Sequence, residues 1–72
     1  MTLLVAERSV GIGVAAVLRV AAEQDAAGTI TVALYLEGAG ARAAEPVLRV
    51  PASATRELAR ALSLLAAELG ER

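Results

Sequence analysis

Apolar and polar side chains alternate along TITVALYLE, the nine residues from Thr29 to Glu37. Alternation with a period of two places successive side chains on opposite faces of a strand, so this segment is predicted to be a β-strand. Residues typical of turns bound it on both sides, at Gln24–Gly28 and at Gly38–Ala41. The segment is therefore expected to form the middle of an antiparallel sheet.

The same period continues toward both ends of the chain. From Val10 to Ala22 every even-numbered residue is apolar, whereas the odd-numbered residues are mostly small or charged. Thr2–Arg8 and Ala43–Val50 are predicted to be two further strands. Pro46 favours the edge of the sheet for the latter, because proline cannot donate a hydrogen bond to a neighbouring strand.

Pairing the strands across their turns places the large aliphatic side chains of three strands on one face. The expected register sets Glu23 opposite Thr29, and Glu37 opposite Ala43. A shift by a single residue would expose all of these aliphatic side chains, so the pattern specifies the apolar face. The residues expected to form one dry layer beneath the helix are Leu18, Val20, Ile30, Val32, Leu34, Leu48 and Val50.

The period changes after Pro51. From Ala54 to Leu69 apolar residues recur every three or four positions, which predicts an amphipathic helix that Ser53 or Thr55 would cap. We expect the helix to lie on its own sheet. Its leucines have the four-three-four spacing of a coiled-coil seam and are also a candidate oligomer interface: Leu58, Leu62, Leu65 and Leu69.

Val14–Gly28 admits a second interpretation as a helix, because alanine, glutamate and glutamine are favourable in helices. The β-branched valines at 10, 14, 17 and 20 and the unbroken alternation favour a strand. The predicted fold class is α+β: an antiparallel β-meander of three to four strands with one C-terminal helix packed on one face (ββββα). Residues 1–72 are expected to form a single domain.

The composition predicts self-association. Hydrophobic residues make up 57% of the chain, yet only one residue is aromatic, and much of the apolar content is alanine. A domain of this size is marginally stable unless disulfides, a metal or self-association add to its core. The chain has no cysteine or histidine, which leaves self-association. We expect a homo-oligomer.

Enzymatic chemistry has no support in this sequence. Histidine, cysteine and lysine are absent, so Ser9, Ser53 and Ser63 have no side chain that could activate them. The string Gly11-x-Gly13-x-x-Ala16 matches a dinucleotide fingerprint but lacks the strand before it and the helix after it. We expect no catalytic residue, no metal and no cofactor.

Charge and hydropathy limit the partners. Seven arginines and eight acidic residues give a net charge of −1, so no basic excess attracts nucleic acid. Met1–Ala6 is apolar, but no basic segment precedes it, and the uncharged run Val10–Leu18 is too short to span a bilayer. We expect a cytoplasmic protein without a membrane partner.

The sheet face opposite the aliphatic layer is the one candidate binding surface, and it carries Arg19, Thr31, Tyr35 and Arg49. Arginines beside an aromatic ring can hold phosphates and a stacked base of single-stranded nucleic acid. Glu23, Glu37 and Glu45 lie beside the arginines, and their negative charges weaken the attraction of the arginines for phosphates. The same face can equally be an ordinary solvated surface, or an assembly surface paved with small residues.

The order of elements resembles that of the PC4-like and Whirly-like single-stranded-DNA-binding proteins, which pair through their helices. The resemblance covers topology only, and no functional residue is carried over from it. It implies single-stranded nucleic-acid binding or transcription regulation on the open sheet face as the alternative function. The leading hypothesis is a small non-enzymatic homo-oligomeric interaction or assembly module, whose partner is a second copy or another protein.

Overall fold

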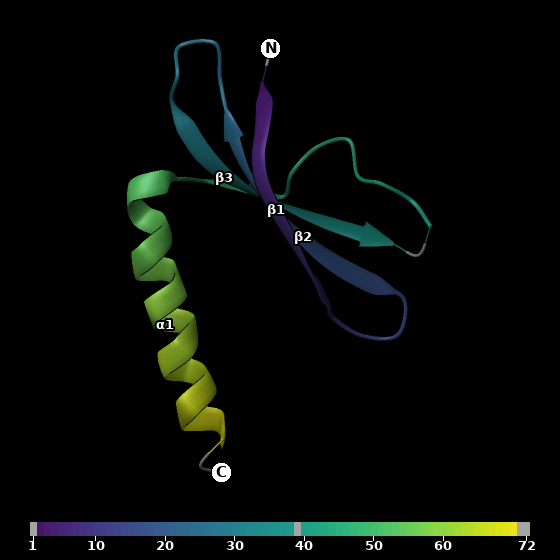
Figure 1. The fold of residues 1–72 in the computed structure, drawn as a ribbon. Coiled ribbons are helices and arrows are strands. Elements are labelled where there is room, and N and C mark those ends of the chain that lie inside the picture. The colour runs from purple at the N-terminus through teal and green to yellow at the C-terminus, as the bar shows by residue number, and fades with distance from the viewer. Residues whose placement is uncertain (1, 39, 71–72) are drawn as a thin grey trace.

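The computed structural model describes residues 2–38 and 40–70, which form one antiparallel sheet followed by one helix (Figure 1). The strands lie side by side in chain order, so the sheet is a meander. This arrangement confirms the predicted α+β fold class. The elements are β1 (Leu3–Gly11), β2 (Ala16–Gln24), β3 (Ile30–Gly38), β4 (Leu48–Pro51) and α1 (Ala52–Gly70).

A hairpin turn divides the segment that was predicted to be one strand from Val10 to Ala22. β1 continues to Gly11 and β2 begins at Ala16. The amide of Ile12 donates to the carbonyl oxygen of Ala16 at 2.9 Å. Gly13 has a φ of 105°, a backbone conformation that residues with a Cβ rarely adopt. The prediction of one strand was wrong, and so was the helical alternative for Val14–Gly28.

The turn between β2 and β3 begins at Asp25, one residue later than predicted. The Asp25 Oδ1 atom accepts hydrogen bonds from the amides of Ala27 and Thr29, both at 2.9 Å. Consequently Glu23 pairs with Thr31 instead of Thr29, and Val20 pairs with Leu34. The register differs from the predicted one by two residues, which leaves every side chain on its predicted face.

The last strand is shorter than predicted. β4 contains only Leu48–Pro51, and the residues before it, which include Pro46, form a loop. Val32 pairs with Val50 and Leu34 with Leu48, again two residues from the expected register. The freed length of chain lets this loop fold back over the sheet.

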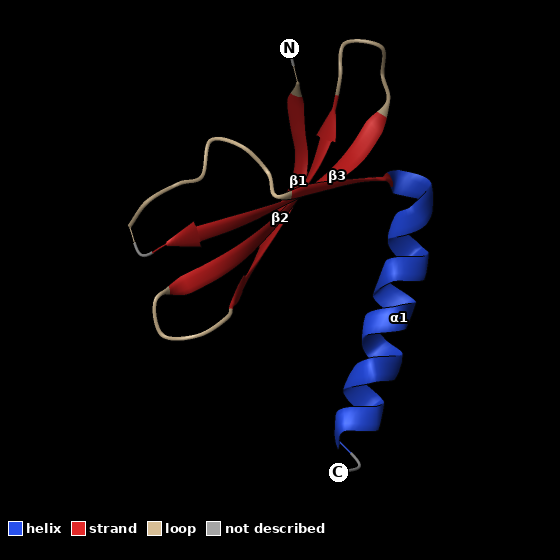
Figure 2. Ribbon diagram, turned by 180° about the vertical axis from the view of Figure 1, so that it is seen from behind, coloured by secondary structure: helices blue, strands red, loops and turns tan. Residues whose placement is uncertain are grey.

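The helix touches the sheet only near its beginning. Ala54, Thr55 and Leu58 are partly buried, whereas every residue from 59 to 70 is exposed. Figure 2 shows α1 leaving the end of β4 and running away from the strands. The helix begins at Ala52, so Ser53 and Thr55 both lie inside it and neither is its N-cap, contrary to the prediction. The Thr55 hydroxyl instead donates to the carbonyl oxygen of Pro51 at 3.2 Å.

The more deeply buried face of the sheet is the one that was expected to be open. We name the even-numbered side the apolar face; it carries the seven expected dry-layer residues together with Ala6, Arg8, Val10, Ala22 and Leu36. We name the odd-numbered side the polar face. The buried residues of the described chain are Arg19, Ala21, Ala33 and Tyr35, all on the polar face.

The expected dry layer is therefore absent from the single chain. Its seven members do share one face, but Leu48 remains 50% exposed and Ile30 38% exposed. The physical reason is that α1 diverges from the apolar face, while the loop before β4 covers the polar face. Ala43 of that loop packs against the buried cluster.

Candidate functional site

The four residues predicted to form a binding surface all lie on the polar face, and two of them are in direct contact. Arg19 pairs with Tyr35 across β2 and β3, and its guanidinium carbon lies 4.0 Å from the centroid of the tyrosine ring. Arg49 lies opposite Ala33, and Thr31 lies opposite Glu23. Arg19 and Tyr35 are only 8% and 6% exposed, so neither presents a free surface to a ligand.

The Arg19 guanidinium is held by carboxylates. Its Nε and Nη2 atoms donate to Glu37 Oε2 at 3.1 and 3.0 Å, and Nη1 lies 3.7 Å from Glu7 Oε2. The hydrogen bond to Glu37 raises the pKa of Arg19. Hydrogen bonds from Arg19 and from the amide of Ala43 lower the pKa of Glu37. The pair is a structural ion pair beneath the loop.

Glu23 connects two of the four predicted residues, Tyr35 and Arg49. The Tyr35 hydroxyl donates to Glu23 Oε2 at 2.6 Å, and Arg49 Nη1 donates to Glu23 Oε1 at 2.8 Å. These hydrogen bonds, from Tyr35 first and Arg49 second, lower the pKa of Glu23. The hydrogen bond to Glu23 raises the pKa of Tyr35. Both predicted arginines are thus neutralised by acids of the same face.

Glu7 is a member of this network that the sequence analysis did not identify. It was expected near the end of a short first strand. Because β1 continues to Gly11, Glu7 lies within the sheet, opposite Ala21 and beside Arg19. It also pairs with Arg42 of the loop at 3.4 Å. Its odd number, matching those of Arg19 and Tyr35, was the available signal.

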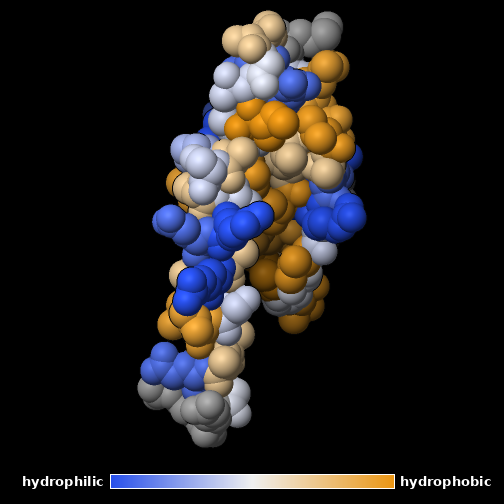
Figure 3. All heavy atoms as spheres, turned by 60° about the vertical axis from the view of Figure 1, so that its left-hand side comes forward, coloured by the Kyte–Doolittle hydropathy of each residue, from blue (hydrophilic) through white to orange (hydrophobic). Residues whose placement is uncertain are grey.

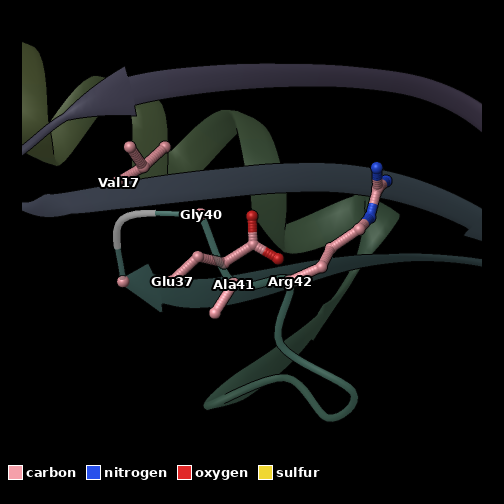
Figure 4. Close-up of a pocket in the computed structure, with 6 residues that line it drawn as sticks. Val17, Glu37, Gly40, Ala41 and Arg42 are labelled. Carbon is pink, nitrogen blue, oxygen red and sulfur yellow. The ribbon is translucent and has the colours of Figure 1, made fainter.

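A recess of about 300 Å³ opens beside this network (Figure 4). Its lining includes Val17, Glu37, Ala41 and Arg42. The Glu37 carboxylate points toward β2. The Arg42 side chain extends along the sheet, away from that carboxylate. The Glu37 Oε2 atom already accepts bonds from Arg19 and Ala43, so the recess offers little charge to a ligand.

The apolar face and the helix form a second, larger surface. Leu62 and Leu65 of the predicted seam are 59% and 54% exposed. A second recess of about 300 Å³ lies between β1, β2, β3 and the first turn of α1, and Val20, Val32 and Thr55 contribute to its lining. In Figure 3 hydrophobic side chains are exposed over the sheet and continue into the hollow beside the helix.

The accessible surface of the whole chain exceeds what is expected of a compact monomer of this mass. The chain has an accessible surface of 5517 Å². A folded monomer of 7.3 kDa is expected to expose about 4,200 Å², so the excess is about 1,300 Å². The radius of gyration is 13.8 Å, whereas a compact domain of this length has about 11 Å. The single chain leaves a hydrophobic surface uncovered.

Lowering the pH is expected to destabilise the polar-face network. The pKa of Glu23 and that of Glu37 are both lowered from the ordinary value of 4.5. Their stabilisation is therefore complete above that value and is lost as the pH falls below it, because the unfolded chain then binds protons more readily. The urea concentration at the midpoint of unfolding, measured at a fixed protein concentration, should decrease as the pH is lowered from about 5 to about 3. The Glu23→Gln/Glu37→Gln double variant should lose most of this dependence, and a flat wild-type profile would contradict the assignment.

Residues 2–38 and 40–70 contain no group of three acidic, histidine or cysteine side chains placed to hold a metal ion. No helix formed by the described residues is long and apolar enough to cross a bilayer.

Comparison with protein-family models, with curated proteins and with solved structures gave no match for this chain. The likeness to the PC4-like and Whirly-like proteins therefore rests on the order of elements alone.

Proposed function

We propose that the protein is a non-enzymatic assembly module whose apolar face and helix bind a second copy of the same chain. The observation that carries the proposal is the excess exposed area of about 1,300 Å². A standard protein interface buries about 800 Å² on each partner, so one twofold contact can cover most of the excess. Self-complementarity supports a second copy as the occupant, because one chain supplies both an open sheet face and an unpartnered leucine stripe.

Single-stranded nucleic acid has weaker support as the ligand. Binding it requires several cationic side chains free to contact phosphates. Arg19 and Arg49 are each engaged by a carboxylate at about 3 Å, and the Tyr35 ring already stacks on Arg19. A base or a phosphate would have to displace the loop and break these ion pairs. The polar face is therefore better explained as a structural layer.

Sedimentation equilibrium over a wide range of protein concentrations tests the proposed function. The wild-type chain is expected to sediment as a dimer at micromolar concentration and to dissociate only on strong dilution. A mass of 7.3 kDa at every concentration would refute the proposal. Circular dichroism on the same samples establishes that the chain is folded when its mass is measured.

A further inference from the structure

The apolar face carries one charged residue that its own chain leaves at the surface. Arg8 of β1 pairs with Val20, so its side chain is on the apolar face, where it is exposed. Among residues 2–38 and 40–70, the one hydrogen-bond acceptor of its Nη1 atom is the neighbouring carbonyl oxygen of Glu7, at 2.8 Å. Arg8 also lines the recess between the sheet and the first turn of α1. A partner that covers this face must supply an acceptor for the guanidinium, because an unpaired charge is costly to bury.

The helix carries acidic residues along one flank of its leucine stripe. Glu57 and Glu68 are eleven residues apart, which is about three turns, so they lie on the same side of α1. That side is next to the stripe of Leu58, Leu62, Leu65 and Leu69. Arg56 and Arg60 lie on the opposite side of the helix from the stripe. A helix that docks through its leucines therefore presents carboxylates at the rim of the contact.

The chain's own helix is poorly placed to pair with Arg8. It packs on β3 and β4, and the residue of its first turn that lines the Arg8 recess is Thr55. Glu57 follows two positions later, about 200° further round the helix, so it is on another side of α1 than Thr55. The described structure contains no ion pair between Arg8 and α1. A helix from a second copy can lie over β1 and β2 without this constraint.

We infer that the two chains exchange helices: α1 of each copy docks its leucine stripe on the apolar face of the other, and Arg8 pairs with Glu57 on the acidic flank of the partner's helix. This inference rests on the proposed assembly function and specifies its geometry. Docking on the partner's apolar face gives the leucines of α1 apolar side chains to pack against. The Arg8 ion pair fixes the direction in which the partner's helix crosses the strands.

Charge exchange between two variants tests the inference. Arg8→Glu and Glu57→Arg are each expected to weaken the homodimer about tenfold or more, because like charges then meet at the rim. Mixing the two variants should restore a heterodimer, since both contacts then join opposite charges. Native mass spectrometry distinguishes the homodimers from the heterodimer by mass. Arg60→Glu, on the far side of α1, is the control and should leave the dimer unchanged.

The outcomes separate the inference from the proposed function. A wild-type chain that stays monomeric refutes both. A wild-type dimer that tolerates both charge variants, or a mixture that forms no preferred heterodimer, overturns helix exchange and leaves the assembly function standing. Circular dichroism checks that each variant is folded. If a reversal prevents folding, the neutral variants Arg8→Gln and Glu57→Gln take its place, and unchanged dimer affinity in both would overturn the inference.

Discussion

Replacing Leu65 with glutamate is expected to dissociate the dimer while leaving the single chain folded. Leu65 is 54% exposed in the chain, so the substitution removes little intramolecular packing. In the proposed dimer the side chain is buried twice, once in each copy. Losing that burial at about 1.5–3 kcal/mol per leucine raises the dissociation constant about 100-fold or more. Sedimentation equilibrium measures the change.

Leu64→Glu is the matched control for this experiment. Leu64 precedes Leu65 in the same helix and is 62% exposed, but it lies about 100° away around the helix, off the leucine stripe. The two variants make the same chemical change at positions of similar exposure. We expect Leu64→Glu not to weaken the dimer, because its carboxylate joins Glu57 on the acidic flank and leaves the leucine stripe intact. Equal effects of the two variants would mean that the stripe does not define the contact.

Replacing Tyr35 with alanine is expected to cost most of the stability of the fold. Tyr35 is the largest side chain in the buried cluster, whose other apolar members are two alanines. Truncating a buried aromatic side chain typically costs about 3–5 kcal/mol. A domain of this length has about 4–11 kcal/mol in total. Urea unfolding at a fixed protein concentration should show a large fall in the midpoint, or no folded baseline.

Tyr35→Phe separates the ring from the hydroxyl. Phenylalanine keeps the ring that stacks on Arg19 and removes only the hydrogen bond to Glu23. The loss of that one bond should cost about 1–2 kcal/mol, because its acceptor is ionised and keeps Arg49 as a donor. If Tyr35→Phe destabilised the chain as much as Tyr35→Ala, the hydroxyl, and not the ring, would be the main contributor.

The alternation of the sequence predicted which side chains share a face, and it could not predict the exact register. Moving the turn start from Gln24 to Asp25 displaces the pairing by two residues, and a shift of two preserves the period. The Asp25 side chain selects the later position by accepting two amide hydrogen bonds. The hairpin between β1 and β2 was hidden for the same reason, because even-numbered residues stay apolar through the turn. The glycine at position 13, where the turn adopts a positive φ, was a sign of it in the sequence.

The alternation of the sequence could not predict which face of the sheet is buried. Hydrophobicity suggested that Leu18, Val20 and their neighbours were inside, but exposure depends on what covers each face. A strand predicted from Ala43 became a loop, and that loop covers Arg19 and Tyr35. Arg19, Thr31, Tyr35 and Arg49 do lie on one face of the sheet, and their role in binding stays a prediction. Glu7, Glu23 and Glu37 contact these residues because of the exact pairing of the strands. The order of residues in the sequence alone does not give that pairing.

The two outer strands bear on how far association can proceed. β1 has an irregularity in its pairing between Leu4 and Ala6, and β4 has four residues and ends in Pro51. Bulges, prolines and short length all hinder the addition of another strand to a sheet margin. Growth into ribbons or fibrils by backbone pairing is therefore disfavoured at both margins. Contact through the faces instead yields a closed particle of finite size, which can stay dispersed at high concentration despite its many exposed leucines and valines.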